Sequence, residues 1–307
     1  MKLGFLAALL SNMKIEELVE WAVNSGFDCL EIAVWPPKSK QICKYWGTNI
    51  NVVELDKSKA KIIKDLFANH NIEISSLAYY ANNLAADPKE RESVHTHLKR
   101  VINAASLLNV DLVGTFIGRD HTKSIAENIK IAIEVFKGLV SYAKDHGVRL
   151  MIENCPMVGW QVEGLIGNIA YAPFIWEELF DSIPQSNFGL NFDPSHLIWQ
   201  QIDYCQILDE FATKIFHCHA KDTKIIKDKL NRNGIYSKNW WIPKIPGSGD
   251  INWKKFTDAL EKIGYSGVVS IELEDSVYEE NEEKVKEGLL KSLNYLRSVI
   301  KEKKWIK

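Results

Sequence analysis

The chain has 307 residues, of which 46% are hydrophobic and 25% are charged, so its composition is that of a globular protein able to bury a large core. A disordered chain, a collagen and a coiled coil are excluded on this composition. Its 38 lysine and arginine residues against 40 aspartate and glutamate residues leave a formal charge of −2. That charge gives no overall attraction for nucleic acid.

Cysteine usage and apolar runs indicate a compartment. The sequence has five cysteines, which are scattered and form no C-x-x-C pair: Cys29, Cys43, Cys155, Cys205 and Cys218. This pattern predicts reduced thiols in a cytoplasmic protein. The first apolar stretch, 3–10, is short for a signal peptide and precedes no small-x-small cleavage site. No apolar run approaches the roughly 20 residues of a membrane helix, so we expect no membrane association.

Short apolar runs alternate with longer amphipathic segments along the whole chain, as in repeated βα units around a parallel sheet. The runs predict strands over 3–8, 29–34, 73–79, 112–118, 149–153, 188–193, 215–219 and 268–273. The amphipathic segments predict helices near 14–25, 58–70, 88–108, 123–146, 173–182, 204–214, 253–263 and 280–303.

The connections between these elements are of two lengths. The turns from helix to strand are short, whereas the connections from strand to helix at 35–57, 154–172 and 220–252 are long. Eight βα units with this asymmetry predict an α/β fold, a (β/α)8 TIM barrel, as a single domain over 1–307. A doubly wound sheet is disfavoured, because no G-x-G-x-x-G follows the first strand.

The last four predicted strands each carry a metal-ligating side chain at or near the C-terminal end: Glu153, Asp193, His219 and Glu272. The C-terminal ends of all barrel strands meet at one mouth, so we expect these side chains to converge there. Three carboxylates and one imidazole suit a divalent ion, with Mn²⁺ first and Mg²⁺, Co²⁺ or Zn²⁺ as alternatives. The sequence therefore predicts one divalent metal site.

Around these four residues the chain resembles the xylose isomerase-like TIM barrel family of sugar phosphate isomerases and epimerases. Members of that family include ketose 3-epimerases and inosose dehydratases. The matching strings are Ile152-Glu153-Asn154, Asp193-Pro194-Ser195-His196, His217-Cys218-His219-Ala220-Lys221-Asp222, Pro246-Gly247-Ser248-Gly249-Asp250 and Ser270-Ile271-Glu272. The resemblance implies that Glu153, Asp193, His219 and Glu272 hold one metal ion. It also implies that His196 contacts substrate.

The expected activity is isomerisation or epimerisation of a keto-sugar by proton abstraction beside the carbonyl, through an enediolate that the metal stabilises. Glu153 and Glu272 are the expected acid/base pair. A lyase or dehydratase acting on an inosose or a 3-keto-glycoside through the same metal site is the alternative. More remote are a non-catalytic carbohydrate-binding barrel and a DNA-repair endonuclease. The resemblance to the endonucleases implies extra histidines at the third and fourth strand ends, which this sequence lacks.

Further residues are expected to contact substrate. His196 and Lys221 are expected to hydrogen-bond substrate oxygens, and Glu31, at the end of the second strand, to accept a substrate hydroxyl. Aromatic faces stack on the C–H surfaces of sugars, and we expect this role for Trp35, Trp160 and Trp241. Loop packing and a subunit contact are alternative roles for these tryptophans. His217, deeper in its strand, is expected to be a packed histidine of the barrel interior.

The loop after the eighth strand bears on the kind of sugar. Phosphate-binding barrels often use the loops after strands seven and eight, but residues 274–280 are acidic and contain no glycine. We therefore expect a sugar without phosphate, and the lysines at 221, 224, 227 and 229 leave a sugar carboxylate open. The expected partner is a small-molecule sugar, with neither nucleic acid nor membrane, and a homo-oligomer is possible.

Overall fold

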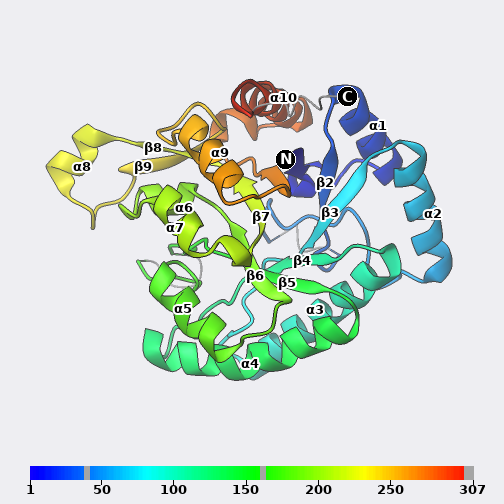
Figure 1. Ribbon diagram of the computed structural model, residues 1–307, viewed down its shortest axis with the longest axis horizontal. Coiled ribbons are helices and arrows are strands. Elements are labelled where there is room, and N and C mark those ends of the chain that lie inside the picture. The colour runs from blue at the N-terminus through cyan, green and yellow to red at the C-terminus, as the bar shows by residue number, and fades with distance from the viewer. Residues whose placement is uncertain (38–41, 160–163, 301–307) are drawn as a thin grey trace.

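The computed structural model describes residues 1–37, 42–159 and 164–300. Within them, eight parallel strands close into a barrel in the order β1-β10-β7-β6-β5-β4-β3-β2 (Figure 1). The barrel strands are β1 (Lys2–Leu6), β2 (Cys29–Ala33), β3 (Glu73–Ala78), β4 (Leu112–Thr115), β5 (Arg149–Glu153), β6 (Phe188–Phe192), β7 (Ile215–Ala220) and β10 (Val268–Ile271). The predicted (β/α)8 barrel is confirmed, with each predicted strand in its expected place.

Helices surround the barrel and cover the outer face of its sheet (Figure 1). The main helices are α1 (Ile15–Ser25), α2 (Lys57–Asn69), α3 (Pro88–Leu108), α4 (Ile125–Asp145), α5 (Pro173–Ser182), α7 (Tyr204–Glu210), α9 (Trp253–Lys262) and α10 (Glu282–Val299). Shorter helical segments are η1 (Ala7–Leu10), α6 (Ser195–Ile198), η3 (Ala212–Lys214) and η4 (Ser276–Tyr278). The helix predicted over 204–214 is divided into α7 and η3.

Burial on both faces explains why the strands read as apolar runs. Every residue of β2, β4 and β6 is buried, because the barrel interior covers one face of each strand and helices cover the other. The pairing places functional side chains of neighbouring strands at one level. Glu153 of β5 is opposite Asn191 of β6, and His219 of β7 is opposite Ser270 of β10.

The connection at 220–252, expected to be a loop, contains an antiparallel hairpin. Strand β8 (Asp222–Ile225) pairs with β9 (Trp241–Lys244), and α8 (Lys227–Asn233) lies between them. This unit, residues 222–244, which we call the arm, projects from the barrel on the left of Figure 1. No apolar run predicted it, because its strands are only four residues long and one of them contains Pro243.

The buried carboxylate of Asp222 fastens the base of the arm. It accepts hydrogen bonds from the backbone nitrogens of Gly247 and Ile251 and from the indole of Trp253, at 2.9–3.0 Å. A side chain at Gly249 would place its Cβ 2.2 Å from Oδ1 of Asp222. The glycines of the 246–250 string therefore allow the chain to wrap closely around this carboxylate. In the described part of the chain, no helix is both long enough and apolar enough to cross a membrane.

Candidate metal centre

Four side chains from neighbouring strands converge at the C-terminal end of the barrel, and we call them the upper cluster: Glu153, Asp193, His219 and Glu272. One ligand atom from each lies within 4.8 Å of the others. Nδ1 of His219 is 3.0 Å from Oε1 of Glu153 and 3.3 Å from Oε2 of Glu272. The structure thus brings together the four residues that the sequence singled out.

Local hydrogen bonds aim Asp193 into the cluster. The Asn154 side chain bonds both backbone groups of Asp193, and the backbone nitrogen of Ser195 donates to Oδ1. Oδ2 of Asp193 is buried and has no hydrogen-bond partner, and the same holds for Nε2 of His196, 3.3 Å away. The Lys221 ammonium, 3.3 Å away, offsets the charge of this oxygen without hydrogen-bonding to it, and a buried carboxylate oxygen favours a further partner. The donor set and this oxygen together fit a divalent cation.

The electrostatics of the cluster are dominated by burial and by excess negative charge. Burial, and next the charge of Glu272, raise the pKa of Glu153. Burial alone would lower the pKa of His219, but the carboxylates around it, led by that of Glu31, raise it well above its usual value. Glu153 and His219 therefore bind protons more tightly than they would in water, and a bound cation would displace those protons.

Lys221 supplies the positive charge beside the cluster. Its ammonium lies 2.5 Å from Oε2 of Glu272, 3.1 Å from Glu274 and 3.3 Å from Oδ2 of Asp193. Burial would raise the pKa of Glu272, but Lys221 and His219 hold it well below its usual value. We expected Lys221 to bond substrate oxygens; in the structure its ammonium contacts these three carboxylates and is almost fully buried.

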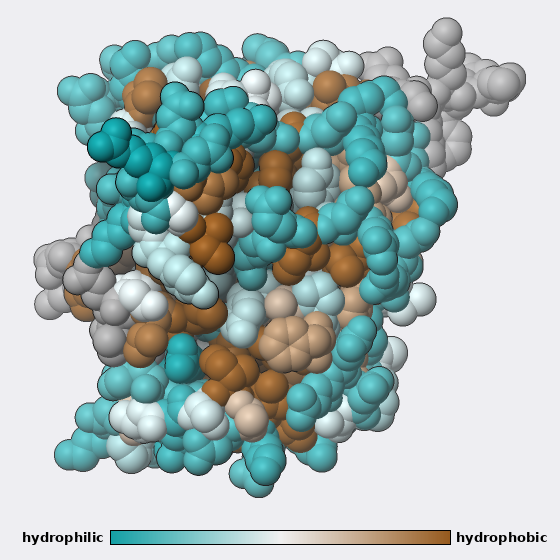
Figure 2. All heavy atoms as spheres, turned by 90° about the vertical axis from the view of Figure 1, so that its left-hand side faces the viewer, coloured by the Kyte–Doolittle hydropathy of each residue, from teal (hydrophilic) through white to brown (hydrophobic). Residues whose placement is uncertain are grey.

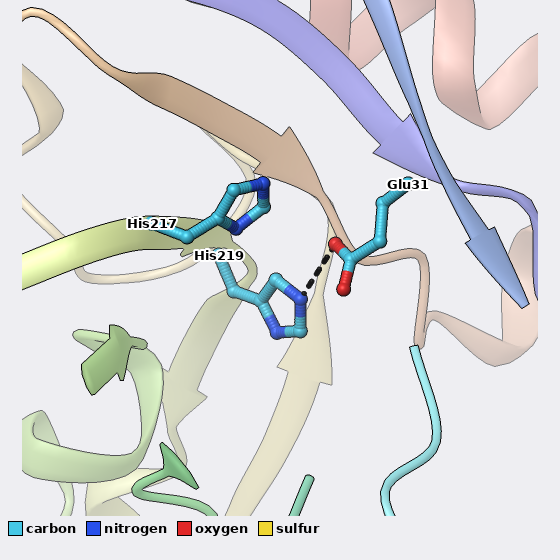
Figure 3. Close-up of side chains that lie close together, drawn as sticks. All are labelled: Glu31, His217 and His219. Atoms are coloured by element: carbon cyan, nitrogen blue, oxygen red, sulfur yellow. Dashed lines mark hydrogen bonds and ion pairs between the residues drawn. The ribbon is translucent and has the colours of Figure 1, made fainter. Parts of the chain in front are cut away.

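A second group of metal-ligating residue types lies deeper in the barrel, and we call it the lower cluster: Glu31, His217 and His219. Figure 3 shows Glu31 of β2 pointing toward His219 of β7, with His217 beside it. Oε2 of Glu31 lies 3.0 Å from Nε2 of His219 and accepts a hydrogen bond from Ser270 at 2.8 Å. Oε1 accepts from the Tyr80 hydroxyl at 2.7 Å. Both oxygens of Glu31 are therefore occupied.

His217 is equally enclosed. Its Nδ1 lies 3.0 Å from Oδ1 of Asn191 and its Nε2 lies 3.3 Å from the Ser75 hydroxyl. Burial lowers the pKa of His217 to about 4, so this ring is neutral. Burial would raise the pKa of Glu31, but the two histidines and the bonds to it lower it to about 2. The ionised Glu31 thus holds Nε2 of His219 and leaves Nδ1 facing the upper cluster, an arrangement common behind metal-ligating histidines.

A cavity opens beside the upper cluster, with Glu153 and Glu272 in its wall. The other lining residues in the described chain are Leu6, Ala8, Leu9, Trp35, Cys43, Tyr45, Trp46, Tyr80, Phe116, Cys155, Met157, Leu273 and Glu274. Both members of the expected acid/base pair are therefore accessible to a molecule bound there.

The other residues predicted to contact substrate lie in different parts of the structure. Trp35 lines the cavity. Trp241 is not among the lining residues; it stacks on Trp199 at the arm, with ring centroids 4.8 Å apart. Trp160 lies outside the described residues. Glu31, expected to accept a substrate hydroxyl, is fully buried in the lower cluster.

Several contributors escaped the sequence analysis. Tyr80 and Asn191 connect the lower cluster, and the Asn191 amide donates to the Tyr80 hydroxyl at 2.6 Å. Their partners come from other strands, so no local spacing marks them. Tyr45 lines the cavity from the connection after β2. The concentration of aromatic residues in that connection was the available signal.

Known proteins resemble this chain in sequence along most of its length. The family model described as "Xylose isomerase-like TIM barrel" matches residues 19–298. The uncharacterized protein YfiH of Bacillus subtilis is 26% identical, with 90% of this chain and 93% of that protein covered. An inosose isomerase of Halalkalibacterium halodurans is 23% identical, with 87% and 85% covered.

A solved structure supports the fold. The crystal structure of the IOLI protein with a bound zinc atom superimposes with a TM-score of 0.69 at 21% sequence identity. The superposition covers 97% of this chain and 96% of that one. The barrel architecture is thus shared by a protein that binds a divalent metal ion.

Proposed function

The chain belongs to the xylose isomerase-like TIM barrel family, and on that premise we propose that it is a divalent-metal-dependent isomerase or epimerase of a keto-sugar. The upper cluster carries this proposal, because its three carboxylates and one imidazole converge beside a cavity that exposes two of the glutamates. The name of the inosose isomerase among its relatives agrees with this class of reaction.

Glu153, Asp193, His219 and Glu272 would hold the ion, with Nδ1 as the ligating atom of the histidine. A divalent ion there supplies Lewis acidity, which lowers the cost of negative charge developing on a ketone oxygen. Hard oxygen donors with one imidazole favour Mn²⁺ as the first choice, and Zn²⁺ is the ion in the related IOLI structure.

Glu153 and Glu272 are the acid/base pair in this proposal. They reach the cavity from different strand ends, so one can remove the proton beside the carbonyl while the other returns a proton to the opposite face. Lys221 supports Glu272 as a carboxylate, the form that accepts a proton. His196, with an unpaired nitrogen beside Asp193, remains our candidate for a substrate hydrogen bond.

The charge of the site favours a substrate without phosphate. Glu153, Asp193, Glu272 and Glu274 lie together with one lysine between them, and such a site repels an anion. Of the basic residues considered for a sugar carboxylate, Lys224 pairs with Asp250 at 2.6 Å. We therefore propose a neutral small-molecule sugar as the partner. We also propose the cytoplasm as the compartment of the protein.

The test is proton NMR of the protein in D₂O with neutral ketohexoses, inosose and 3-keto-glucosides, with Mn²⁺ and with chelator. We expect deuterium beside the carbonyl only in the metal-loaded sample. Exchange that survives chelation contradicts the metal dependence. Product formed without exchange contradicts the proton-transfer step, and absence of both from the metal-loaded protein on every compound contradicts the activity. A product that has lost one water relative to the substrate, in place of exchange alone, would identify the dehydratase alternative.

A further inference from the structure

The cavity has two chemically different sides. Its acidic residues, Glu153, Glu272 and Glu274, lie at the ends of β5 and β10, whereas an apolar side is formed by residues that follow β2, β3 and β4. There the rings of Trp35 and Tyr80 lie 6.2 Å apart, and those of Tyr80 and Phe116 lie 5.3 Å apart. These rings form one continuous aromatic wall, and the Tyr80 ring also meets the His219 ring edge-on, with centroids 5.6 Å apart. A sugar hydroxyl placed against this wall would lose water without gaining a partner.

Both tyrosine hydroxyls of the lining are already hydrogen-bonded within the protein. The Tyr80 hydroxyl donates to Glu31, and the Tyr45 hydroxyl donates to Glu279 at 2.9 Å. Glu274, the remaining acidic residue of the described lining, pairs with Lys221. A free hexose, with a hydroxyl on nearly every carbon, would therefore find hydrogen-bond partners mainly at its metal-facing end.

The apolar lining continues outward to the surface. Half-buried Leu9, Cys43, Trp46 and Met157 follow the aromatic wall, and together these four residues form what we call the apolar track. Next to it in the chain, Ile42 is 79% exposed and Val158 is 54% exposed. Figure 2, which views the molecule from the side of the arm, shows hydrophobic side chains near the middle of that face and hydrophilic ones around it.

We propose that the substrate is a keto-sugar glycoside whose apolar aglycone lies along the apolar track, while its sugar ring meets the upper cluster. This inference rests on the proposed function and sharpens its substrate class. The track begins in the wall of the same cavity as the acid/base pair, so one molecule can occupy both. Burial of the aglycone provides affinity that the few free polar groups of this side do not supply.

The experiment compares phenyl β-glucoside with methyl β-glucoside by isothermal titration calorimetry on the Mn²⁺-loaded protein. Neither compound has a carbonyl group, so binding is measured without turnover. We expect the phenyl compound to bind at one site at least about tenfold more tightly, given the apolar area of a phenyl ring. Equal affinities, or no binding of either, overturn the inference whatever the outcome of the exchange experiment.

A substitution in the apolar track tests whether the phenyl group binds there. Met157 has φ 47°, a left-handed conformation that asparagine adopts readily, so Met157→Asn adds polarity without backbone strain. It should reduce the ratio of phenyl to methyl affinity about threefold or more. Phe174→Asn, an exposed residue of α5 outside the lining, should leave that ratio unchanged.

Two further results would overturn the proposal. An unchanged affinity ratio in Met157→Asn would place the phenyl group elsewhere. Light scattering could show that the protein is a dimer. If the phenyl compound then bound more tightly only after dilution to monomer, the apolar face would be the contact with a second copy of the chain.

Discussion

The upper and lower clusters share His219 and both combine carboxylates with histidine, yet only one of them is suited to bind a ligand. In the lower cluster, Glu31 and His217 are fully buried, and protein groups occupy both oxygens and both nitrogens. In the upper cluster, Oδ2 of Asp193 accepts no hydrogen bond, although the Lys221 ammonium lies 3.3 Å away, and a cavity reaches two of the carboxylates. Residue type alone therefore does not identify a metal site; unsatisfied atoms and access do.

The largest expected difference between the clusters is in catalysis. Glu153→Gln and Glu272→Gln should each lower turnover by about 10²- to 10⁴-fold, because each removes a proton-transfer group. Steady-state kinetics on the substrate identified by deuterium exchange measures this, with bound Mn²⁺ determined in parallel. Turnover unchanged in both variants would refute the acid/base assignment.

The lower cluster should act on the metal only through His219. Glu31→Gln should weaken Mn²⁺ binding by about 10- to 100-fold, because it removes the charge that supports Nε2 of His219. His217→Gln is the matched control, since this ring contacts Asn191 and Ser75 and no residue of the upper cluster other than His219, which it faces at 6.1 Å. Calorimetric titration with Mn²⁺ would contradict this view if His217→Gln weakened binding as much as Glu31→Gln.

Acidity should weaken metal binding at the upper cluster. His219 and Glu153 both have raised pKa values and hold protons without metal, whereas metal binding requires their unprotonated forms. Affinity should therefore rise with pH, by up to about tenfold per pH unit for each proton released. Titrations in buffers of different ionisation enthalpy count these protons, and a count of zero would show that the cluster is already deprotonated.

The smallest expected effect concerns stability. Ser270→Ala removes one of the hydrogen bonds to Glu31 and should lower the free energy of unfolding by about 1 kcal/mol, as urea denaturation would measure. Mn²⁺ affinity should change less than in Glu31→Gln, because the contact between Glu31 and His219 remains. A larger loss of metal affinity in Ser270→Ala would mean that the two clusters act as one unit.

The sequence best predicted those features of the structure that follow from a residue's position along the chain. Apolar runs located the barrel strands, and barrel geometry then brought Glu153, Asp193 and Glu272 to one mouth. It was least informative where partners come from distant strands. The bond from Tyr80 to Glu31 joins residues 49 apart in the chain. No local pattern encodes such a pairing.

The ends of the arm meet at one point. Asp222 pairs with Lys244, and the same Asp222 carboxylate binds Gly247 and Ile251, where the chain returns to the barrel. The arm also contacts the barrel ends elsewhere, since Trp241 stacks on Trp199 beyond β6 and Lys244 pairs with Asp275 beyond β10 at 2.9 Å. Loss of the Asp222 carboxylate would therefore release the base of the arm and the following 246–250 segment together.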